Sequence, residues 1–373
     1  MPANVTSPAP PEISVIIPAR NEEANLAACL DSLISQTGAA FEIIVVDDHS
    51  TDRTREIAAS FSNRGVRLIE APELPPNWTG KNNALADGSR AAQGQWLLFT
   101  DADTVHQPGS LARALAEARE HHADMLSYSP EQIAVTFWEM AILPVIFAEL
   151  ARQYPPSEVR DPNSPVAAAN GQYILITREA YNAVGGHAAI ASEILEDVAL
   201  ARAIKQSGRK IFFRYAADAV RTRMYRNFGE LREGWTKNLA LLFSAPVRVA
   251  TLRALEFILI VGGTATAAIN SLHGHAPSAA IAATLAIVLY ALFLTRIRRA
   301  QFSWDSNLRA LFGLPLFSYL LLRSAVHHRR GNVTWKGRAY SKSDPQEMSE
   351  KPHLKRPYNN ERGEESKLLA TGH

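Results

Sequence analysis

The chain has 373 residues, of which 39 are Lys or Arg and 37 are Asp or Glu, so its formal net charge is +2. This near-balance excludes the strong basic excess of a global nucleic-acid-binding surface, and we expect no nucleic-acid partner. The single cysteine, Cys29, excludes an intrachain disulfide framework and a cysteine-cluster zinc site, and it indicates a reducing compartment.

The N-terminal two thirds of the chain alternate between strand and helix patterns. Residues 1–11 lack the basic and apolar regions of a cleaved signal peptide and predict a flexible leader. After them, the predicted strands are 13–17, 41–46, 66–69, 95–99 and 124–128, and the predicted helices are 21–36, 52–61, 81–92 and 108–121. This alternation predicts parallel βαβ units whose ligands bind at the carboxyl ends of the strands. Three polar clusters lie at such ends: 19–23, 47–52 and 101–103.

The C-terminal third contains three apolar stretches. Residues 254–272 and 277–295 are each 19 residues long, with Glu256 as the one charge in the first and none in the second. Each is long enough to cross a bilayer core, so they predict a helical hairpin in the membrane. The alternative is a buried hairpin in a soluble domain. The third stretch, 310–326, contains Pro315, and we expect a re-entrant or in-plane segment or a third helix.

Both flanks of the predicted hairpin are basic. Residues 221–253 hold seven Lys or Arg and two acidic residues, and 296–338 hold nine and one. The positive-inside rule places both flanks in the cytoplasm, which predicts a multi-pass protein of the cell (inner) membrane with its N-terminal domain cytoplasmic. The basic segment 327–340 precedes a polar tail, 341–373, that we expect to be disordered.

The polar clusters contain candidate ligands for a metal and a nucleotide. Asp101 and Asp103, one residue apart in a loop, are suited to share a hard cation such as Mg²⁺ or Mn²⁺, which keeps positions open for phosphate oxygens. Such pairs also occur in simple solvated loops. Asp47 and Asp48 end the second strand, where carboxylates accept hydrogen bonds from a base or ribose. The alternative for that cluster is helix capping by Ser50 or Asp52, and for 18–23 a simple strand-to-helix turn.

The three clusters together carry a resemblance. Residues 16–22 (Ile-Ile-Pro-Ala-Arg-Asn-Glu), 45–52 (Val-Val-Asp-Asp-His-Ser-Thr-Asp) and Asp101-Ala102-Asp103 resemble, in order and spacing, the family 2 glycosyltransferases of the GT-A fold. The resemblance implies an α/β domain with a Rossmann-like mixed sheet over 12–245, followed by a region of transmembrane helices over 246–326. It implies inverting, metal-dependent hexosyl transfer from a nucleotide-diphosphate sugar, which we expect to be a UDP-sugar, with Asp101 and Asp103 holding the metal.

Two further motifs extend the resemblance. Residues 78–85 resemble the family's Gly-Lys segment, which implies that Lys81 contacts the diphosphate; the alternative is a surface lysine at a helix start. Glu196-Asp197 resembles the family's Glu-Asp motif and implies that Asp197 is the general base, with Glu196 on the acceptor side or stabilising its helix dipole. The donor-binding candidates are Pro18, Ala19, Arg20, Glu22, Asp47, Asp48, Lys81, Asp101 and Ala102.

The region 232–238 departs from the Gln-x-x-Arg-Trp motif of the processive synthases in this family. Gly234 stands where that motif has the arginine before the tryptophan, Trp235. The departure favours transfer of one sugar over polymer synthesis. A processive polysaccharide synthase and a non-catalytic membrane scaffold are the alternatives. We expect Trp235 to line the acceptor pocket or to be a core tryptophan.

A narrower resemblance concerns the acceptor. Residues 72–81, 234–238 and 333–340 resemble the hopene-associated glycosyltransferases and the related carotenoid-acid glycosyltransferases. This implies a lipid, polyisoprenoid-type acceptor in the hopanoid pathway. The apolar segment 133–150, interrupted by Pro144, is predicted to lie at the bilayer surface or to be a buried helix.

Overall fold

The computed structural model describes residues 10–335 and 338–340, with side chains described up to residue 332. Most of the predicted leader 1–11, residues 336–337 of the basic segment and the whole predicted tail 341–373 lie outside the described residues.

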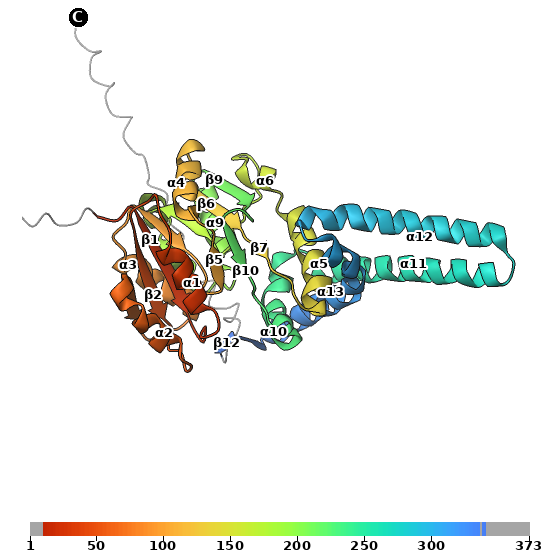
Figure 1. Cartoon of the computed structure of the whole chain (residues 1–373), viewed down its shortest axis with the longest axis horizontal. Coiled ribbons are helices and arrows are strands. Elements are labelled where there is room, and N and C mark those ends of the chain that lie inside the picture. The colour runs from red at the N-terminus through yellow and green to blue at the C-terminus, as the bar shows by residue number, and fades with distance from the viewer. Residues whose placement is uncertain (1–9, 336–337, 341–373) are drawn as a thin grey trace, which may run out of the picture. The chain divides into compact units, whose positions relative to one another are not determined.

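A seven-stranded mixed sheet forms the centre of the N-terminal domain (Figure 1). Its strands, in spatial order, are β3 (Val66–Glu70), β2 (Phe41–Asp47), β1 (Ile13–Ala19), β4 (Trp96–Phe99), β8 (Ile174–Thr177), β6 (Met125–Ser129) and β9 (Ile211–Tyr215). The predicted strands and the mixed sheet are confirmed. Strands β3, β2, β1 and β4 are parallel neighbours, and β8, which the sequence pattern did not predict, lies between β4 and β6 and is antiparallel to both.

Helices cover both faces of this sheet. On one face, α1 (Leu26–Ile34) and α4 (Ser110–Glu120) pack against Val15 and Ile17; on the other, α3 (Gly80–Ala91) and α9 (Glu196–Gln206) pack against Ile16. Burial on both faces explains the unbroken apolar run of β1. Gly88 lets α3 approach closely, because a Cβ there would lie 2.5 Å from Cγ2 of Ile16. Helices α2 (Thr54–Ser60), α6 (Pro156–Arg160), α7 (Arg178–Ala183) and α8 (Gly186–Ala189) are short connections.

A three-stranded sheet joins the Asp101–Asp103 loop to later parts of the chain. Its order is β5 (Thr104–His106), β10 (Val220–Thr222) and β7 (Glu131–Gln132). Thr222 donates a hydrogen bond from Oγ1 to the backbone oxygen of Asp103 at 3.2 Å. This sheet therefore holds the loop next to the chain that leads into the C-terminal helices.

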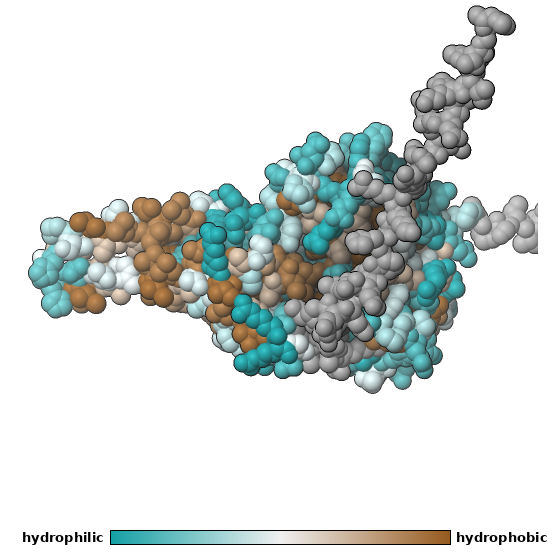
Figure 2. All heavy atoms as spheres, turned by 180° about the vertical axis from the view of Figure 1, so that it is seen from behind, coloured by the Kyte–Doolittle hydropathy of each residue, from teal (hydrophilic) through white to brown (hydrophobic). Residues whose placement is uncertain are grey.

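The C-terminal region is helical. It comprises α5 (Phe137–Gln153), α10 (Phe228–Asn238), η2 (Leu239–Leu242), α11 (Pro246–Leu272), α12 (Ala276–Ile297), η3 (Arg298–Ala300) and α13 (Trp304–Arg330), followed by the paired strands β11 (Val333–Trp335) and β12 (Arg338–Tyr340). Helices α11 and α12 form the predicted hairpin (Figure 1), and hydrophobic side chains gather along its outside (Figure 2). Their most apolar windows are only 6% and 11% buried, which argues against the alternative of a buried hairpin.

Helix α13 corrects one expectation for the third apolar stretch. It is also long and apolar enough to cross a membrane, but half of its most apolar window is buried, against α5 and α11. It runs unbroken through Pro315, which removes a single backbone donor from the helix. A re-entrant segment needs a break where the chain reverses, so that option is wrong; an in-plane helix and a third spanning helix both stay open.

Helix α5 is buried along most of its length. Residues Ala141 to Ile146 lie in the core formed with α10 and α13, and Pro144 sits inside the helix. At its start, the side chains of Phe137 and Trp138 are exposed. The helix that was predicted as either surface-seated or buried therefore has a buried body and an exposed aromatic end.

Candidate active site

A cavity of about 330 Å³ lies at the carboxyl ends of β1 and β4 and extends toward α5 and α10. It is lined by every predicted site residue except Asp47. The loops that follow β1, β2 and β4 form its polar side, and the C-terminal helices form an apolar side. The parallel strands place these loops at one edge of the sheet.

Hydrogen bonds fix the loops after β1 and β2 against each other. Arg20 donates from Nη1 to the backbone oxygens of Asp48 at 2.6 Å and His49 at 3.2 Å. The backbone nitrogen of Asn21 donates to Oγ of Ser50 at 3.1 Å. Asn21 and His49 both have a φ near +50° (52° and 53°), a left-handed conformation that is unfavourable for non-glycine residues. The hydrogen bonds hold this strained backbone beside the cavity, where Asp48 and Arg20 line the wall.

Two carboxylates of the second cluster have roles in the turn. Oδ1 of Asp47, which does not line the cavity, accepts a hydrogen bond from the backbone nitrogen of Ser50 at 3.3 Å. Oδ1 of Asp52 accepts from the backbone nitrogen of Thr54 at 3.0 Å, which fixes the turn before α2, although the N-cap position of that helix is Arg53. Asp48 is therefore the better placed of the two predicted nucleotide-binding aspartates.

Asp101 and Asp103 line the cavity after β4, and Lys81 reaches this loop from the start of α3. Thr79 caps α3 by accepting from the backbone nitrogen of Asn82 at 3.2 Å. Nζ of Lys81 lies 2.8 Å from Oδ1 of Asp101 and 2.6 Å from Oε1 of Glu196. Burial acts to lower the pKa of Lys81, but the two carboxylates outweigh it and raise that pKa well above its usual value. The alternative of a simple surface lysine is therefore wrong.

The carboxylates of this loop fit a hard divalent cation by their chemistry. Carboxylate oxygens are the ligands that Mg²⁺ and Mn²⁺ prefer. Within residues 10–335 and 338–340, no group of three or more His, Cys, Asp or Glu side chains is arranged to hold a metal ion. A cation bound by Asp101 and Asp103 therefore needs further oxygen ligands, and phosphate groups of a bound nucleotide are suited to supply them.

The Glu196-Asp197 pair at the start of α9 has two different electrostatic environments. Asp197 accepts hydrogen bonds from the backbone nitrogens of Gly171 at 2.9 Å and Val198 at 2.8 Å. Burial, together with the charge of Glu196, raises the pKa of Asp197 to about 6. Burial also acts to raise the pKa of Glu196, but the Lys81 ammonium outweighs it and the pKa is lowered. Carboxylates with separated pKa values are typical of acid–base chemistry, and Asp197 is the one suited to be a base near neutral pH.

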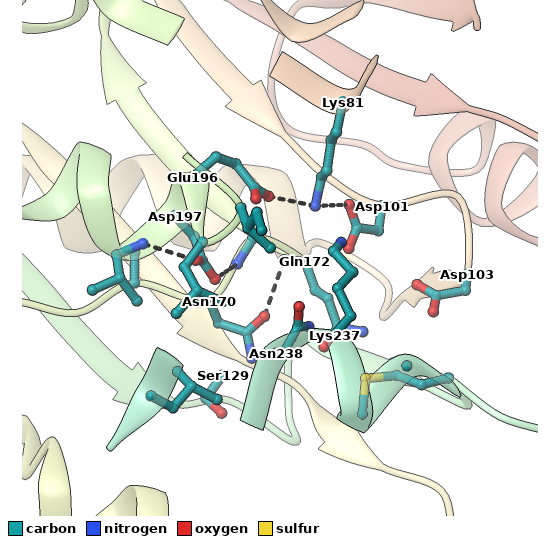
Figure 3. Close-up of a pocket in the computed structure, with 18 of the residues that line it drawn as sticks. Lys81, Asp101, Asp103, Ser129, Asn170, Gln172, Glu196, Asp197, Lys237 and Asn238 are labelled. Atoms are coloured by element: carbon teal, nitrogen blue, oxygen red, sulfur yellow. Dashed lines mark hydrogen bonds and ion pairs between the residues drawn. The ribbon is translucent and has the colours of Figure 1, made fainter. Parts of the chain in front are cut away.

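Sequence reasoning missed Gly171, which lies beside this pair. A Cβ at Gly171 would lie 3.0 Å from Oε1 of Glu196 and 3.2 Å from Nζ of Lys81, so a glycine leaves room for their ion pair. The neighbouring Asn170 and Gln172 also line the cavity (Figure 3). Nothing in the local pattern of 167–172 indicates this role, which depends on the position of α9.

Sequence reasoning also missed Lys237 and Asn238 at the end of α10. Both project into the cavity opposite Lys81 and Glu196 (Figure 3). Burial lowers the pKa of Lys237, while Glu196 and Asp101 act in the opposite direction. The processive-synthase motif pointed to Trp235 in the same helix. Nothing in the sequence indicated separately that Lys237, two residues later, lines the cavity.

The far side of the cavity is apolar. Phe147, Leu150 and Ala151 line it from α5, Tyr154 lines it directly after that helix, and Trp235 lines it from α10. The rings of Phe147 and Trp235 meet edge to face, with centroids 6.1 Å apart. Trp235 is 5% exposed and belongs to the apolar core as well as to the cavity wall, and its contact with an acceptor stays a prediction.

The absence of the arginine before Trp235 has a structural basis. A Cβ at Gly234 would lie 2.4 Å from Oη of Tyr225 and 2.5 Å from its Cε1. Tyr225 itself lines the cavity and is buried. An arginine at position 234 therefore requires the ring of Tyr225 to move.

Comparisons with known proteins agree with this architecture. Residues 14–185 match the family model described as Glycosyl transferase family 2. The 4,4'-diaponeurosporenoate glycosyltransferases of Staphylococcus aureus strains USA300 and MRSA252 are 28% and 29% identical to this chain, and each comparison covers 90% of this chain and 89% of the relative. The structure of the mannosyltransferase PcManGT from Pyrobaculum calidifontis in complex with GDP-Man and Mn²⁺ matches with a TM-score of 0.50 at 19% identity, covering 85% of this chain and 87% of that chain.

The structural likeness shows the fold, and the residues matched by the family model include β1 to β8 and the polar loops after β1, β2 and β4. The chain thus has a mixed α/β fold of the GT-A type, and its residues 14–185 are similar to the Glycosyl transferase family 2 model.

Proposed function

We propose that the protein is a membrane-associated inverting glycosyltransferase that moves one sugar from a UDP-sugar to a lipid acceptor. The observation that carries this proposal is the cavity itself, because one continuous space joins a charged side to an apolar side. A nucleotide-diphosphate sugar requires the first environment, and a long hydrocarbon acceptor requires the second.

The donor occupies the polar side. Asp48 accepts hydrogen bonds from the nucleoside, and the backbone of Pro18 and Ala19 with Arg20 and Glu22 forms the wall beside it. Lys81 places a positive charge next to the diphosphate. Asp101 and Asp103, with Ala102 between them, would hold Mg²⁺ or Mn²⁺, which offsets negative charge on the leaving diphosphate when bound.

Asp197 is the general base in this proposal. Its carboxylate takes the proton of an acceptor hydroxyl while that oxygen forms a bond to the anomeric carbon. The bond from the anomeric carbon to the diphosphate breaks, and its electron pair leaves with the nucleoside diphosphate. One displacement of this kind inverts the anomeric centre. Glu196 cannot replace the base, because Lys81 holds it in an ion pair at 2.6 Å.

The acceptor is a polyisoprenoid-type lipid with a hydroxyl or carboxyl group, and the hopanoid pathway is the expected source. The relatives from Staphylococcus aureus are named for 4,4'-diaponeurosporenoate, which supports an acceptor of this class. The aromatic and aliphatic wall formed by α5 and α10 supports it independently. An acceptor carboxyl group is already ionised at neutral pH and needs no base, so the pH profile separates the two acceptor chemistries.

The membrane arrangement follows from the exposed apolar surface. The α11–α12 hairpin spans the bilayer and the glycosyltransferase domain lies in the cytoplasm. Helix α13 lies in the membrane surface, because the apolar residues on its outward side form one exposed stripe, at Leu308, Phe312, Tyr319, Leu322 and Val326. Phe137 of α5 extends this stripe, with its ring 6.3 Å from that of Phe312.

The test is sugar transfer by membranes that contain the full chain. Membranes are incubated with a panel of labelled UDP- and GDP-sugars, and label is measured in the organic extract. We expect label in the lipid fraction with one UDP-sugar and, for a hydroxyl acceptor, none with an Asp197→Asn variant that still binds UDP. Label that appears only in water-soluble polymer, or in no fraction at all, would contradict the proposal.

A further inference from the structure

Glu149 is a buried carboxylate that the proposed reaction does not use. It lies near the C-terminal end of α5 and is fully buried, between cavity-lining residues of the same helix. A charged group in such a position requires partners of opposite charge, because an unpaired buried charge is strongly destabilising.

The partners of Glu149 come from both helices of the hairpin. Its Oε1 lies 3.3 Å from Nε of Arg253 on α11 and 3.5 Å from Nε of Arg296 on α12. Both arginines are largely buried, with side chains 14% and 16% exposed. One carboxylate of α5 is therefore held between the two helices that carry the membrane anchor.

A second carboxylate fixes the same two arginines to each other. Glu256 of α11 accepts hydrogen bonds from Nη1 of Arg253 at 2.6 Å and from Nη1 and Nη2 of Arg296 at 2.9 and 2.7 Å. Glu149, Arg253, Glu256 and Arg296 thus form one cluster, which we call the hairpin–α5 cluster. Arg152 also contacts Glu149, at 3.1 Å from Oε2, but it belongs to α5 and does not reach the hairpin.

The opposite side of α5 faces the acceptor end of the cavity. Phe147, Leu150 and Ala151 are spaced i, i+3 and i+4, so they form one stripe along the helix, and they line the cavity together with Tyr154, which follows the last residue of α5. Glu149, two positions after Phe147, points about 200° away from that residue around the helix axis. A rotation or displacement of α5 that breaks the cluster therefore moves the apolar wall of the cavity.

The polar side of the cavity is held by ion pairs of its own, and the ion pair of Arg223 with Glu139, at 3.0 Å, ties the start of α5 and not its Glu149 end to the chain after β10. Lys81, Asp101 and Glu196 hold each other by ion pairs between α3, the loop after β4 and α9. These elements belong to the layers around the seven-stranded sheet. The donor side is therefore expected to keep its geometry when α5 is released from the hairpin.

We propose that the hairpin–α5 cluster couples the membrane hairpin to the acceptor wall, with Glu149 as a positioning residue for the lipid acceptor. The inference rests on the proposed function, because it assigns the acceptor to the apolar side of the cavity. It predicts that loss of the Glu149 charge impairs acceptor binding and leaves donor binding intact.

The test compares Glu149→Gln with Arg152→Gln in full-length protein in lipid nanodiscs. The donor probe is UDP with Mn²⁺, measured by calorimetry. The acceptor probe is all-trans-retinoic acid, a polyene carboxylate, measured by quenching of tryptophan fluorescence at constant lipid. We expect Glu149→Gln to weaken retinoic acid binding at least tenfold and to change UDP binding less than twofold. Arg152→Gln, which removes a contact within α5, should change neither by more than twofold.

Two further measurements keep the proposal open to refutation. Hydrogen exchange of the α5 segment 147–153 should accelerate at least tenfold in Glu149→Gln, while that of β1 and β4 stays unchanged. A Glu149→Gln/Arg296→Gln double variant should weaken retinoic acid binding no more than the single variant, because both changes break the same connection.

The outcomes separate this inference from the proposed function. Equal loss of UDP and retinoic acid binding, in both the single and the double variant, would show a general folding role and overturn the inference. Unchanged exchange in α5 would also overturn it. Wild-type protein that binds UDP but no retinoic acid would contradict the acceptor assignment. The hydrogen exchange of α5 in Glu149→Gln would then test by itself whether the hairpin holds this helix.

Discussion

Replacing Glu196 with glutamine tests whether Asp197 is the general base, because two charged neighbours shift the pKa of Asp197 in opposite directions. Burial and the negative charge of Glu196 raise the pKa of Asp197 to about 6, and the Lys81 ammonium lowers it. With a pKa near 6, the base form is about half populated at pH 6 and about one tenth at pH 5. The transfer rate to a hydroxyl acceptor should therefore fall about tenfold for each pH unit below this limb.

The Glu196→Gln variant should move this acid limb to lower pH. The change removes the charge that raises the pKa of Asp197 and leaves the Lys81 ammonium, which lowers it. Loss of a neighbouring carboxylate charge is expected to shift the limb by about one unit. The base form then persists to lower pH, so relative activity at pH 5 should exceed that of the wild type.

The assay is the initial rate of lipid glycosylation from pH 4.5 to 8 at saturating donor, with UDP binding at each pH as a control for folding. Asp197→Asn should lower the rate by about 10²- to 10⁴-fold on the plateau above the acid limb, and the limb itself should be lost. Superimposable acid limbs for wild type and Glu196→Gln, or substantial turnover by Asp197→Asn, would refute the assignment of the base.

Three other changes probe separate parts of the structure. Lys81→Met removes the ammonium that bridges two carboxylates at 2.6 and 2.8 Å. The donor KM should rise at least about tenfold, with little change in retinoic acid binding, and an unaltered KM would show that Lys81 does not bind the donor. Asp103→Asn, like EDTA treatment, should abolish transfer and weaken UDP binding in the presence of Mn²⁺, and transfer that is indifferent to chelation would exclude the metal role. Gly313→Ala should destabilise the packing of α13 on α5 by about 3 kcal/mol, because the added Cβ would overlap the backbone oxygen of Ala141. The measurement is thermal unfolding, and a melting temperature equal to that of the wild type would show that the two helices separate easily.

The sequence predicted the elements and clusters that depend on local pattern. Apolar runs marked β1, β2, β3, β4 and β6, and the polar residues after β1, β2 and β4 meet at one edge because these strands are parallel neighbours. The position of β8 could not be predicted in the same way. Its pairing with β4 joins residues separated by a long connection, and strand order across such a connection is not encoded in the periodicity of either strand.

The candidate site shows the same difference between residues in local motifs and residues placed by tertiary contacts. Asp101, Asp103, Glu196 and Asp197 lie in short motifs, so their chemistry is readable from the sequence. Gly171 matters because α9 brings Glu196 beside it, and this neighbour is 25 positions away. The apolar wall from α5 and the contact of Glu149 with the hairpin depend on which helix faces which. Helical periodicity predicts a face but does not identify its partner.

The third apolar stretch shows what composition alone could not decide. With Pro315 in it, the sequence left a re-entrant segment, an in-plane segment and a third helix open, and α13 is one continuous helix whose buried side packs against α5 and α11. Ser318 contributes to this packing by donating from Oγ to the backbone oxygen of Ala250 at 2.8 Å. Tertiary contacts of this kind compensate for the backbone hydrogen bond that a proline removes.

The most direct test of the central claim is the mass and stereochemistry of the lipid product. Lipids extracted after incubation of the full chain with its donor sugar are analysed by mass spectrometry, and the anomeric configuration of the product is determined by NMR. The account predicts a lipid that is heavier by a single sugar, with the anomeric centre inverted relative to the donor. A ladder of repeated sugar additions, a retained anomeric configuration, or sugar released only by reaction with water would contradict it.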